Sequence, residues 1–282
     1  MRLSKKNGLP WLANWNDPWN FLREPHHSGG LTSNIGIRQA IFCKKVSSNA
    51  SLNTFPSEKL RQAMSGYLSI QDLKKTYCIP HISLNHIHYE QPQNNRFTIT
   101  FCGRLWKYQD PSPFFQALSE FLGSSRSKNI AVIFVGHDDV GVTKLASRYN
   151  LQDVVSYKGT LSYKESLCLM GKSDALLLID PPDAQGLLLT SKLVDYASVG
   201  RPILAVTTKG SETESMLRAH GGGAASDYFD INSIINNLGI FYNAWSANLI
   251  SDTYSSTSLA EFFSSDSILS IYERIFNTLC MV

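Results

Sequence analysis

The stretch Phe97-Thr98-Ile99-Thr100-Phe101-Cys102-Gly103-Arg104 decides the fold class of this chain. A short run of apolar and β-branched residues that ends at a glycine predicts a buried strand followed by a tight turn. Short apolar segments of this kind alternate with amphipathic segments as far as about residue 245. We expect strands at 97–102, 130–135, 154–157, 175–179 and 203–206, and helices at 111–122, 143–149, 163–170, 187–199, 211–219 and 231–244, with residues 221–225 ending the run before the last helix.

Continuous apolar strands that alternate with amphipathic helices predict a parallel, doubly wound sheet. The fold class is therefore α/β, and residues 93–250 are expected to form a complete C-terminal Rossmann-like domain. The polar, proline-containing stretch 91–95 before the first strand is typical of a linker.

Residues 1–92 show a less regular pattern. We expect strands at 9–15, 51–55 and 78–84 and helices at 34–45 and 57–67. A small open sheet of this kind is marginally stable alone, so we expect residues 1–92 to be the end of a larger domain, a partial N-terminal Rossmann-like domain. Residues 251–282 are expected to form a serine-rich linker and a helix, at 268–279, that packs back towards the N-terminal domain.

The composition of the 282 residues excludes several classes of protein. With 43% hydrophobic and 17% charged residues, the chain is expected to fold rather than to be disordered. No apolar run approaches the roughly 20 residues that span a bilayer, and we expect no secretory signal. The five cysteines are scattered without a CxxC pair, which argues against a disulfide framework and a structural zinc site and favours a reducing, cytoplasmic location.

Charge is distributed unevenly along the chain. Residues 1–96 hold twelve Lys/Arg and five Asp/Glu, a net charge of +7, whereas residues 97–282 hold fourteen and eighteen, a net charge of −4. Basic surfaces attract phosphates, anionic lipids or nucleic acid. A solvated basic face without a partner is an equally good interpretation of the charge alone.

The turn after the first strand of the C-terminal domain is the first candidate site. It contains Gly103, Arg104 and Lys107. Ligands of doubly wound sheets bind at the carboxyl ends of the strands, so a guanidinium and an ammonium here could hold the two phosphates of a sugar nucleotide. The alternative is a pair of ordinary surface cations.

A second candidate site follows the strand at 175–179. Gly186 at an expected helix start would let a ligand approach free N–H groups, which favour phosphate. Ser191, Lys192 and Asp195 fall on or near one helical face, and the acid could accept hydrogen bonds from ribose hydroxyls. An exposed ion pair between Lys192 and Asp195 is the alternative.

Weaker candidates lie at other strand ends. Gly136 and His137 could bring polar groups to the same edge of the sheet, and Tyr157 could help to read a nucleotide base. Residues 221–223 are three glycines that form either a phosphate-facing loop or a close-packed turn. The spacing of His86 and His88 permits a metal site, but no third ligand with convincing spacing follows, and we expect no metal. The motifs of P-loop NTPases, α/β-hydrolases, zincins and simple dehydrogenases do not occur.

Taken together, several stretches resemble the donor-binding half of GT-B glycosyltransferases, specifically the retaining group called family 4. They are 101–107 (FCGRLWK), 135–137 (VGH), 155–159 (VSYKG), 173–178 (SDALLL) and 191–204 (SKLVDYASVGRPIL). Residues 8–12, 17–19 and 79–81 resemble the last part of that family's acceptor domain.

The resemblance implies roles for individual residues. Arg104 and Lys107 would bind the donor diphosphate, and Asp195 would match the second acid of the family's E-x7-E motif, which contacts the donor ribose. The first acid of that motif is replaced by Leu187. Nothing in residues 1–8 resembles the glycine-rich start of the acceptor domain, so the resemblance also implies a truncated N-terminal domain.

The resemblance implies a retaining, metal-independent hexosyltransferase without a cofactor, acting on a nucleotide-diphosphate sugar. Its acceptor would be a cell-envelope polysaccharide or a lipid-linked glycan, and nucleic acid is not expected as a partner. The basic first third suits peripheral contact with the inner face of the cell membrane. Two alternatives stay open: a non-catalytic sugar-nucleotide-binding remnant and, with less support, a sugar-nucleotide epimerase.

Overall fold

The computed structural model describes residues 2–17, 34–83, 89–106, 109–123, 129–138, 140–182 and 186–280. The chain divides into two compact units. The first unit comprises Met1–Ile82, Asp183–Leu189 and Ser265–Val282, and the second comprises Ser83–Pro182 and Thr190–Ser264. The sequence predicts domain borders at residues 92 and 250, whereas the borders between the two structural units lie at residues 82 and 264.

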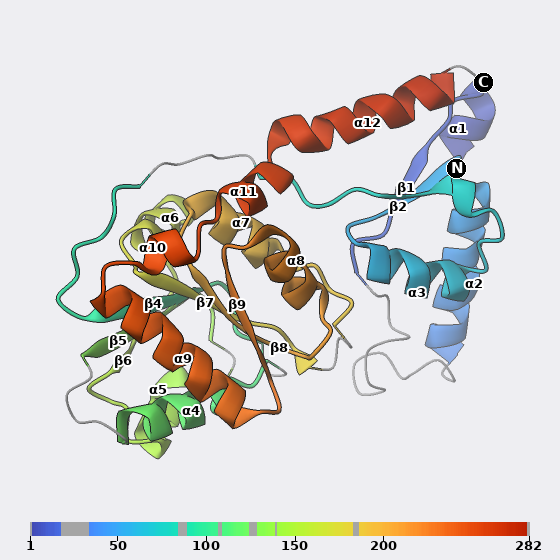
Figure 1. Cartoon of the computed structure of the whole chain (residues 1–282). Helices are drawn as coiled ribbons and strands as arrows, with labels where there is room; N and C mark the ends of the chain where they lie inside the picture. The colour runs from blue at the N-terminus through green and yellow to red at the C-terminus, as the bar shows by residue number, and fades with distance from the viewer. Residues whose placement is uncertain are drawn as a thin grey trace. The chain divides into compact units, whose positions relative to one another are not determined.

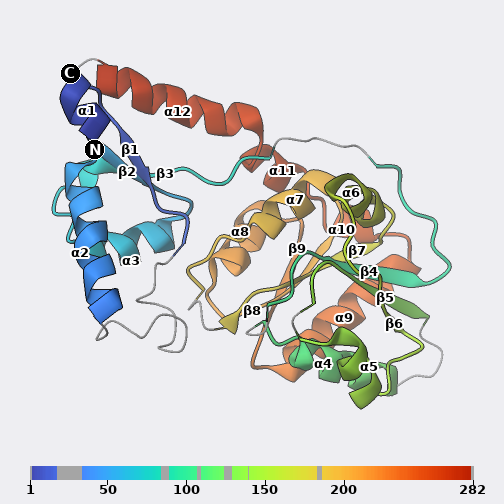
Figure 2. The same ribbon diagram turned by 180° about the vertical axis from the view of Figure 1, so that it is seen from behind.

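The second unit contains a parallel sheet whose described strands follow the order β6-β5-β4-β7-β8-β9 (Figures 1 and 2). These strands are β4 (Phe97–Cys102), β5 (Ile130–Val135), β6 (Val155–Tyr157), β7 (Ala175–Ile179), β8 (Ile203–Thr207) and β9 (Gly223–Asp227). From β4 the chain adds strands towards one edge, and from β7 it adds them towards the other. The predicted doubly wound sheet is confirmed, and its topological switch point lies between β4 and β7.

Helices cover both faces of this sheet (Figure 1). On one face α4 (Ser112–Gly123), α5 (Val142–Arg148) and α9 (Ile231–Ser246) bury aromatic and aliphatic side chains against alternate residues of the strands. On the other face lie α6 (Tyr163–Gly171), α7 (Ser191–Val199), α8 (Glu212–His220) and α11 (Thr257–Phe262). A short helix, α10 (Ile250–Thr253), packs beside α9.

One predicted helix boundary in this unit is wrong. The sequence predicted a helix at 187–199, but α7 begins at Ser191, after the N-cap Thr190. The sequence pattern assigns Leu187 and Leu189 to an amphipathic helix. Instead, Leu187 packs against the apolar core of the first unit and Leu189 is buried. Gly186 is therefore not the first residue of a helix.

The first unit contains a three-stranded parallel sheet of order β1-β2-β3 among its described residues. Its elements are α1 (Arg2–Asn7), β1 (Leu12–Asn14), α2 (Asn34–Asn49), β2 (Leu52–Phe55), α3 (Glu58–Leu68), η2 (Leu73–Lys75), β3 (Thr76–Cys78) and α12 (Ser265–Cys280). Ile268 and Ile275 of α12 pack against Leu52 and Ile79 of this unit. The predicted third strand at 78–84 is misplaced, because pairing with β2 ends at Cys78 and Pro80 follows without an N–H to donate.

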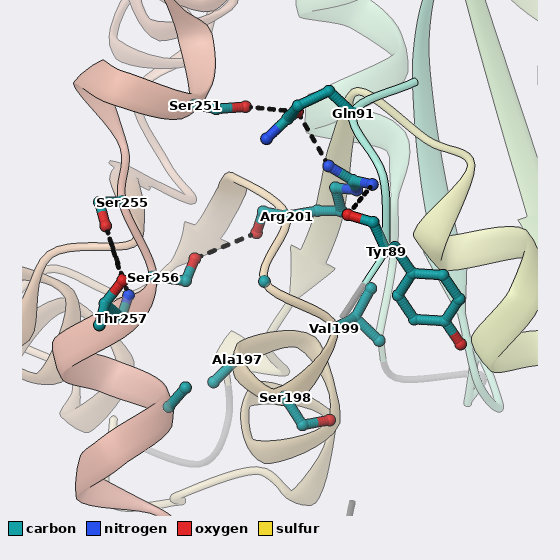
Figure 3. Close-up of a pocket in the computed structure, with 12 residues that line it drawn as sticks. Tyr89, Gln91, Ala197, Ser198, Val199, Arg201, Ser251, Ser255, Ser256 and Thr257 are labelled. Atoms are coloured by element: carbon teal, nitrogen blue, oxygen red, sulfur yellow. Dashed lines mark hydrogen bonds between the residues drawn. The ribbon is translucent and has the colours of Figure 1, made fainter. Parts of the chain in front are cut away.

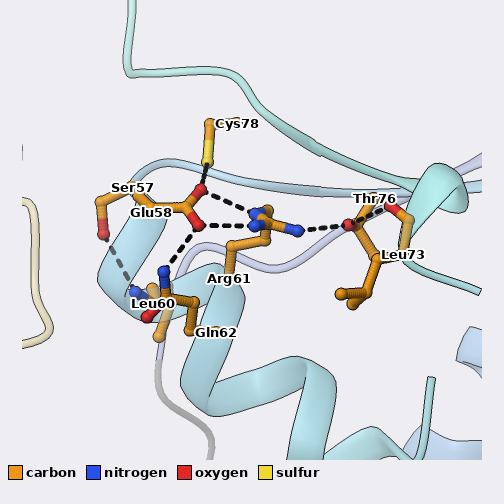
Figure 4. Close-up of polar contacts among 8 residues, drawn as sticks. All are labelled: Ser57, Glu58, Leu60, Arg61, Gln62, Leu73, Thr76 and Cys78. Carbon is orange, nitrogen blue, oxygen red and sulfur yellow. Dashed lines mark hydrogen bonds and ion pairs between the residues drawn. The ribbon is translucent and has the colours of Figure 1, made fainter. Parts of the chain in front are cut away.

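A polar cluster joins α3 to β3 (Figure 4). The Arg61 guanidinium donates two hydrogen bonds to the Glu58 carboxylate, at 2.7 and 2.5 Å, and one to Thr76 Oγ1 at 2.8 Å. Cys78 Sγ lies 3.2 Å from Glu58 Oε2. The hydrogen bond from Arg61 is the main reason that the pKa of Glu58 falls to about 2. The cluster fixes the first turn of α3 against the neighbouring strand.

Several predicted features lie outside the described residues: Lys107, His86 and His88, and most of the stretch 17–19. Among the residues that are described, no group of three or more His, Cys, Asp or Glu side chains could hold a metal ion. In the same part of the chain, no helix has both the length and the apolar character needed to cross a membrane.

Candidate functional site

The tyrosine of α7 fixes this helix against the switch point of the sheet. The Tyr196 hydroxyl is buried, accepts a hydrogen bond from the Cys102 N–H at 2.8 Å, and lies 3.1 Å from the carbonyl oxygens of Cys102 and Leu177. Side chains four residues apart share one face of a helix. Lys192 therefore lies one turn earlier on the face that meets the end of β4.

Gly103 and Lys192, predicted in two separate motifs, are in direct contact. A β-carbon added at Gly103 would lie 2.6 Å from Cε of Lys192. Gly103 also has a φ of +132°, which side-chain-bearing residues rarely adopt. The glycine thus gives the lysine side chain the space to run along the turn that follows β4, where its Nζ lies 5.7 Å from the centre of the Phe101 ring.

The neighbouring strand ends continue this surface. A β-carbon at Gly136, which has a φ of +123°, would lie 2.1 Å from the Gly103 carbonyl oxygen. Gly136 donates from its N–H to the Gly159 carbonyl, and its own carbonyl accepts a hydrogen bond from the Tyr157 hydroxyl at 2.8 Å. Lys192, Gly103, Gly136 and Tyr157 therefore form one continuous series of contacts along the carboxyl edge of β4, β5 and β6.

Arg104 is exposed at the same edge, and its guanidinium carbon lies 3.8 Å from the centre of the Trp106 ring. Such stacking restricts the Arg104 side chain at this edge of the sheet. The next residue, Leu105, donates from its N–H to the carbonyl of His137 at 2.8 Å, which joins the turns after β4 and β5. His137 itself is exposed, and Lys107 lies outside the described residues.

Gln109 holds the turn after β4, a role that the sequence did not suggest. Its side chain is buried, donates to the Ile179 carbonyl at 2.9 Å and accepts from the Trp106 N–H at 3.2 Å. The amide thus ties the loop that carries Arg104 to the end of β7. A buried Gln beside exposed residues has no distinctive sequence pattern, so only the tertiary contacts identify it.

Lys192 is electrostatically coupled to Asp180, which follows β7. Burial lowers the pKa of Lys192, and the Asp180 carboxylate opposes that shift. Asp180 is itself buried and accepts hydrogen bonds from Thr207 Oγ1 at 3.0 Å and Thr213 Oγ1 at 2.6 Å. Burial raises the pKa of Asp180 despite these hydrogen bonds. The signal that the sequence offers for Asp180 is its position directly after a buried strand.

Asp195 does not have Lys192 as its partner. The Asp195 carboxylate accepts a hydrogen bond from the Tyr163 hydroxyl of α6 at 2.9 Å. Burial raises the pKa of Asp195, and this hydrogen bond lowers it. The charges of Asp195 and Lys192 both act on the pKa of Cys102, so the two side chains lie near the end of β4. An exposed ion pair between them is therefore not what the structure contains.

The helix start expected at Gly186 is found further along the chain. Gly186 groups with the first unit and has a φ of +69°. The N-terminus of α7 is formed instead by Thr190, whose side chain accepts from the Lys192 N–H, and by the exposed Ser191. The backbone N–H groups at the N-terminus of α7 thus lie in the same helical turn as Lys192.

A separate cavity of about 370 Å³ lies near the start of β8, at the opposite end of the strands (Figure 3). Buried Arg201 lies beside it, and its guanidinium donates to the Gly171 carbonyl at 2.7 and 3.0 Å and to Gln91 Oε1 at 2.9 Å. It also donates to the carbonyls of Tyr89 and Glu90. Arg201 thus holds residues 89–91 against the rest of the second unit.

Comparisons with known proteins identify the fold. No protein-family model and no curated protein matches the sequence. Among solved structures, HepE of Anabaena, in complex with UDP-glucose, matches 99% of this chain and 74% of its own at 14% identity, with a TM-score of 0.69. TarM of S. aureus, solved with UDP among its ligands, matches 95% of this chain and 51% of its own at 11% identity, with a TM-score of 0.71.

A third similar structure, sucrose-phosphate synthase of Thermosynechococcus elongatus, matches 99% of this chain and 70% of its own at 12% identity, with a TM-score of 0.67. The chain has the GT-B fold. These structural neighbours are glycosyltransferases, and the HepE and TarM structures contain UDP-glucose and UDP, respectively. At such low identity the similarity establishes the fold, and this chain spans about half the length of TarM and three quarters of HepE.

Proposed function

We propose that the second unit binds the diphosphate of a nucleotide-sugar donor and that the chain transfers the sugar to a glycan. The observation that carries this proposal is the contact of Lys192 with Gly103 at the switch point of the sheet, beside Arg104. Ligands of doubly wound folds bind at that crevice. A glycine turn, a helix N-terminus and two cations match the charge and shape of a diphosphate.

Transfer leaves negative charge on the diphosphate as the bond to the sugar breaks. In the proposal Lys192 and Arg104 stabilise this charge electrostatically, and Lys107 adds a third cation. Lys192 is suited to the role because its ammonium group is largely buried from solvent and interacts electrostatically with the Asp180 carboxylate. The proposed reaction retains the configuration of the sugar and requires no metal ion or other cofactor.

The remaining residues would bind the nucleoside. We assign the donor ribose to Asp195, with Tyr163 orienting its carboxylate, and the base to the surface around Tyr157, Gly136 and His137. UDP is the first nucleotide to test because the similar structures of HepE and TarM contain UDP-glucose and UDP. The proposed acceptor is a cell-envelope polysaccharide or a lipid-linked glycan, and the proposed site of reaction is the cytoplasmic face of the membrane.

Calorimetry with UDP and UDP-glucose, paired with an assay of donor hydrolysis, tests this proposal. We expect UDP to bind the unmodified chain and Arg104→Met to weaken binding at least tenfold. Arg148→Met is the matched control, because Arg148 also lies beside an aromatic ring, that of Tyr149, but on α5. Lack of binding to UDP and GDP would refute the proposal. Binding without hydrolysis or transfer to any acceptor would favour a non-catalytic sugar-nucleotide-binding protein.

A further inference from the structure

A second cavity of the second unit, of about 750 Å³, lies at the amino ends of β4 and β7. Its walls are the polar stretch 91–95, which precedes β4, Asp174, which precedes β7, and residues between Trp245 and Asp252. The volume falls within the range of roughly 300–1,000 Å³ that is usual for ligand sites. The six residues of β4 separate this cavity from the donor site by roughly 20 Å.

Amide side chains dominate the lining of this cavity. They belong to Gln91, Gln93, Asn94, Asn95 and Asn248. Each amide carries two N–H donors and an oxygen acceptor, so it can exchange hydrogen bonds in both directions with a hydroxyl group. The lining therefore suits a ligand that carries many hydroxyls.

The charges at the cavity argue against an anionic ligand. Asp174 and Asp252 line it, and the described part of its wall contains no Lys or Arg. A phosphate or carboxylate would lose water and meet repulsion without a cation to compensate. A neutral ligand has no such cost.

Trp245 adds an apolar wall whose position is fixed. The centre of its ring lies 5.6 Å from that of Phe97 in the core, and the Trp245 side chain hydrogen-bonds to Asp174. Asp174 is buried and also accepts from the Thr98 N–H at 2.8 Å and from Asn94 Nδ2 at 3.1 Å. Because Asp174 uses the indole N–H, Trp245 offers a ligand mainly its ring.

Gln91 joins this cavity to the smaller one beside Arg201 (Figure 3). Gln91 and Ser251 line both cavities. Gln91 Oε1 accepts from Arg201 at 2.9 Å and from Ser251 Oγ at 2.8 Å, which leaves its N–H groups to donate to a ligand. The smaller cavity adds the hydroxyls of Ser255 and Thr257. A ligand of several linked units could therefore extend from one cavity into the other.

We propose that the two cavities together form a groove that binds a neutral glycan chain. A pyranose ring has a face of C–H groups and a rim of hydroxyls. The C–H face would lie on the Trp245 ring, and the hydroxyls would pair with amides such as Gln93 and Asn95.

The position of the groove gives it a role separate from catalysis. It lies at the opposite end of the strands from the donor site, so it would hold an internal part of a long acceptor and not the reacting end. In naming the acceptor as its ligand the inference rests on the proposed function, but the binding itself requires no nucleotide.

Calorimetry of the full chain with pentasaccharides tests the groove. The neutral probes are maltopentaose, cellopentaose and chitopentaose, and we expect at least one to bind with a Kd of about 1 mM or tighter. Trp245→Ala should weaken this binding at least about tenfold. Gln93→Ala with Asn95→Ala should weaken it at least about fivefold. Pentagalacturonate, which carries a carboxylate on each ring, should bind at least about tenfold more weakly than the best neutral probe.

Matched variants of the second unit control for the loss of an aromatic ring or of amides. Phe229→Ala removes a ring that is 71% exposed, and Gln152→Ala with Asn236→Ala removes two exposed amides. Both should bind the pentasaccharide as the unmodified chain does. Circular dichroism checks folding, and if Trp245→Ala fails to fold, the variant of Gln93 and Asn95 decides.

Titration with UDP separates the groove from the donor site. The variant of Gln93 and Asn95 should bind UDP normally, and Arg104→Met should bind the pentasaccharide normally. A failed groove would thus leave UDP binding intact, and a failed donor site would leave pentasaccharide binding intact.

Three results would overturn the proposal. The first is that none of the neutral pentasaccharides binds. The second is binding that the groove variants weaken no more than their controls do. The third is competition between UDP and the pentasaccharide, since the glycan would then lie at the carboxyl edge of the sheet.

Discussion

Gly103 and Lys192 belong to different elements, yet the lysine side chain fills the space that any side chain at position 103 would need. A β-carbon at Gly103 would lie 2.6 Å from Lys192 Cε and 3.3 Å from Cδ. The position of the Lys192 side chain in the first turn of α7 therefore depends on a glycine in the turn after β4. In the proposed function, this contact sets the position of the ammonium that meets the donor diphosphate.

Substitution of Gly103 by Ala tests this dependence. The new methyl group would displace the Lys192 side chain, and the φ of +132° disfavours alanine in addition. We expect UDP affinity to fall at least tenfold by calorimetry. Gly123→Ala is the control, because nothing lies within 4 Å of a β-carbon there and the residue ends helix α4. Equal UDP affinity of Gly103→Ala and Gly123→Ala would contradict the proposed site.

Asp180 should control the pH range in which the donor binds. Its carboxylate raises the pKa of Lys192 against the lowering by burial, so Asp180→Asn should lower the pKa of the lysine further. The ammonium form is lost as pH rises through this pKa. The alkaline limit of UDP binding should thus move to lower pH in the variant, as measured by titrations between about pH 7 and 10. An unchanged alkaline limit would exclude electrostatic support of Lys192 by Asp180.

Tyr163 should act on the donor only through Asp195. Tyr163→Phe removes the hydrogen bond of 2.9 Å, whose net contribution of about 1 kcal/mol corresponds to a fivefold loss of UDP affinity. In an Asp195→Asn background the same substitution should have a much smaller effect. Tyr272→Phe on α12 is the control and should leave affinity unchanged. Additive losses in the double variant would show that Tyr163 acts independently of Asp195.

Arg201 should stabilise the second unit without taking part in donor binding. Arg201→Met would leave the buried Gly171 carbonyl and the part-buried carbonyls of Tyr89 and Glu90 without their donor, at a cost of about 3 kcal/mol in the free energy of unfolding. Exposed Arg218→Met should change this free energy by less than about 0.5 kcal/mol. Urea unfolding compares the stabilities of the Arg201→Met and Arg218→Met variants. Equal midpoints would show that the Arg201 contacts contribute little to the free energy of unfolding.

The sequence predicted the scaffold better than the contacts of the site. Runs such as Ala175–Ile179 are buried on both faces, so their composition alone indicates a strand of a parallel sheet. The predicted helix start at residue 187 is wrong because Leu187 and Leu189 suit both an amphipathic helix and an extended segment packed on a core. Only the tertiary structure distinguishes these two conformations.

The direction of a side chain is also decided by tertiary structure. Lys192 and Asp195 could form an i,i+3 pair in an isolated helix, but Tyr196 fixes the helix so that Lys192 lies against Gly103 and Asp195 meets Tyr163. Asp180 and Gln109 act through buried hydrogen bonds to residues distant in sequence. No local pattern contains that information.

The most direct test of the donor site is the difference in affinity between UDP and uridine, measured by calorimetry on the unmodified chain and on Lys192→Met. The two ligands share the nucleoside and differ in the diphosphate. We predict that the unmodified chain binds UDP at least a hundredfold more tightly than uridine, and that Lys192→Met reduces this ratio at least tenfold while uridine affinity stays the same. A ratio that Lys192→Met leaves unchanged would contradict a diphosphate site at Gly103 and Lys192.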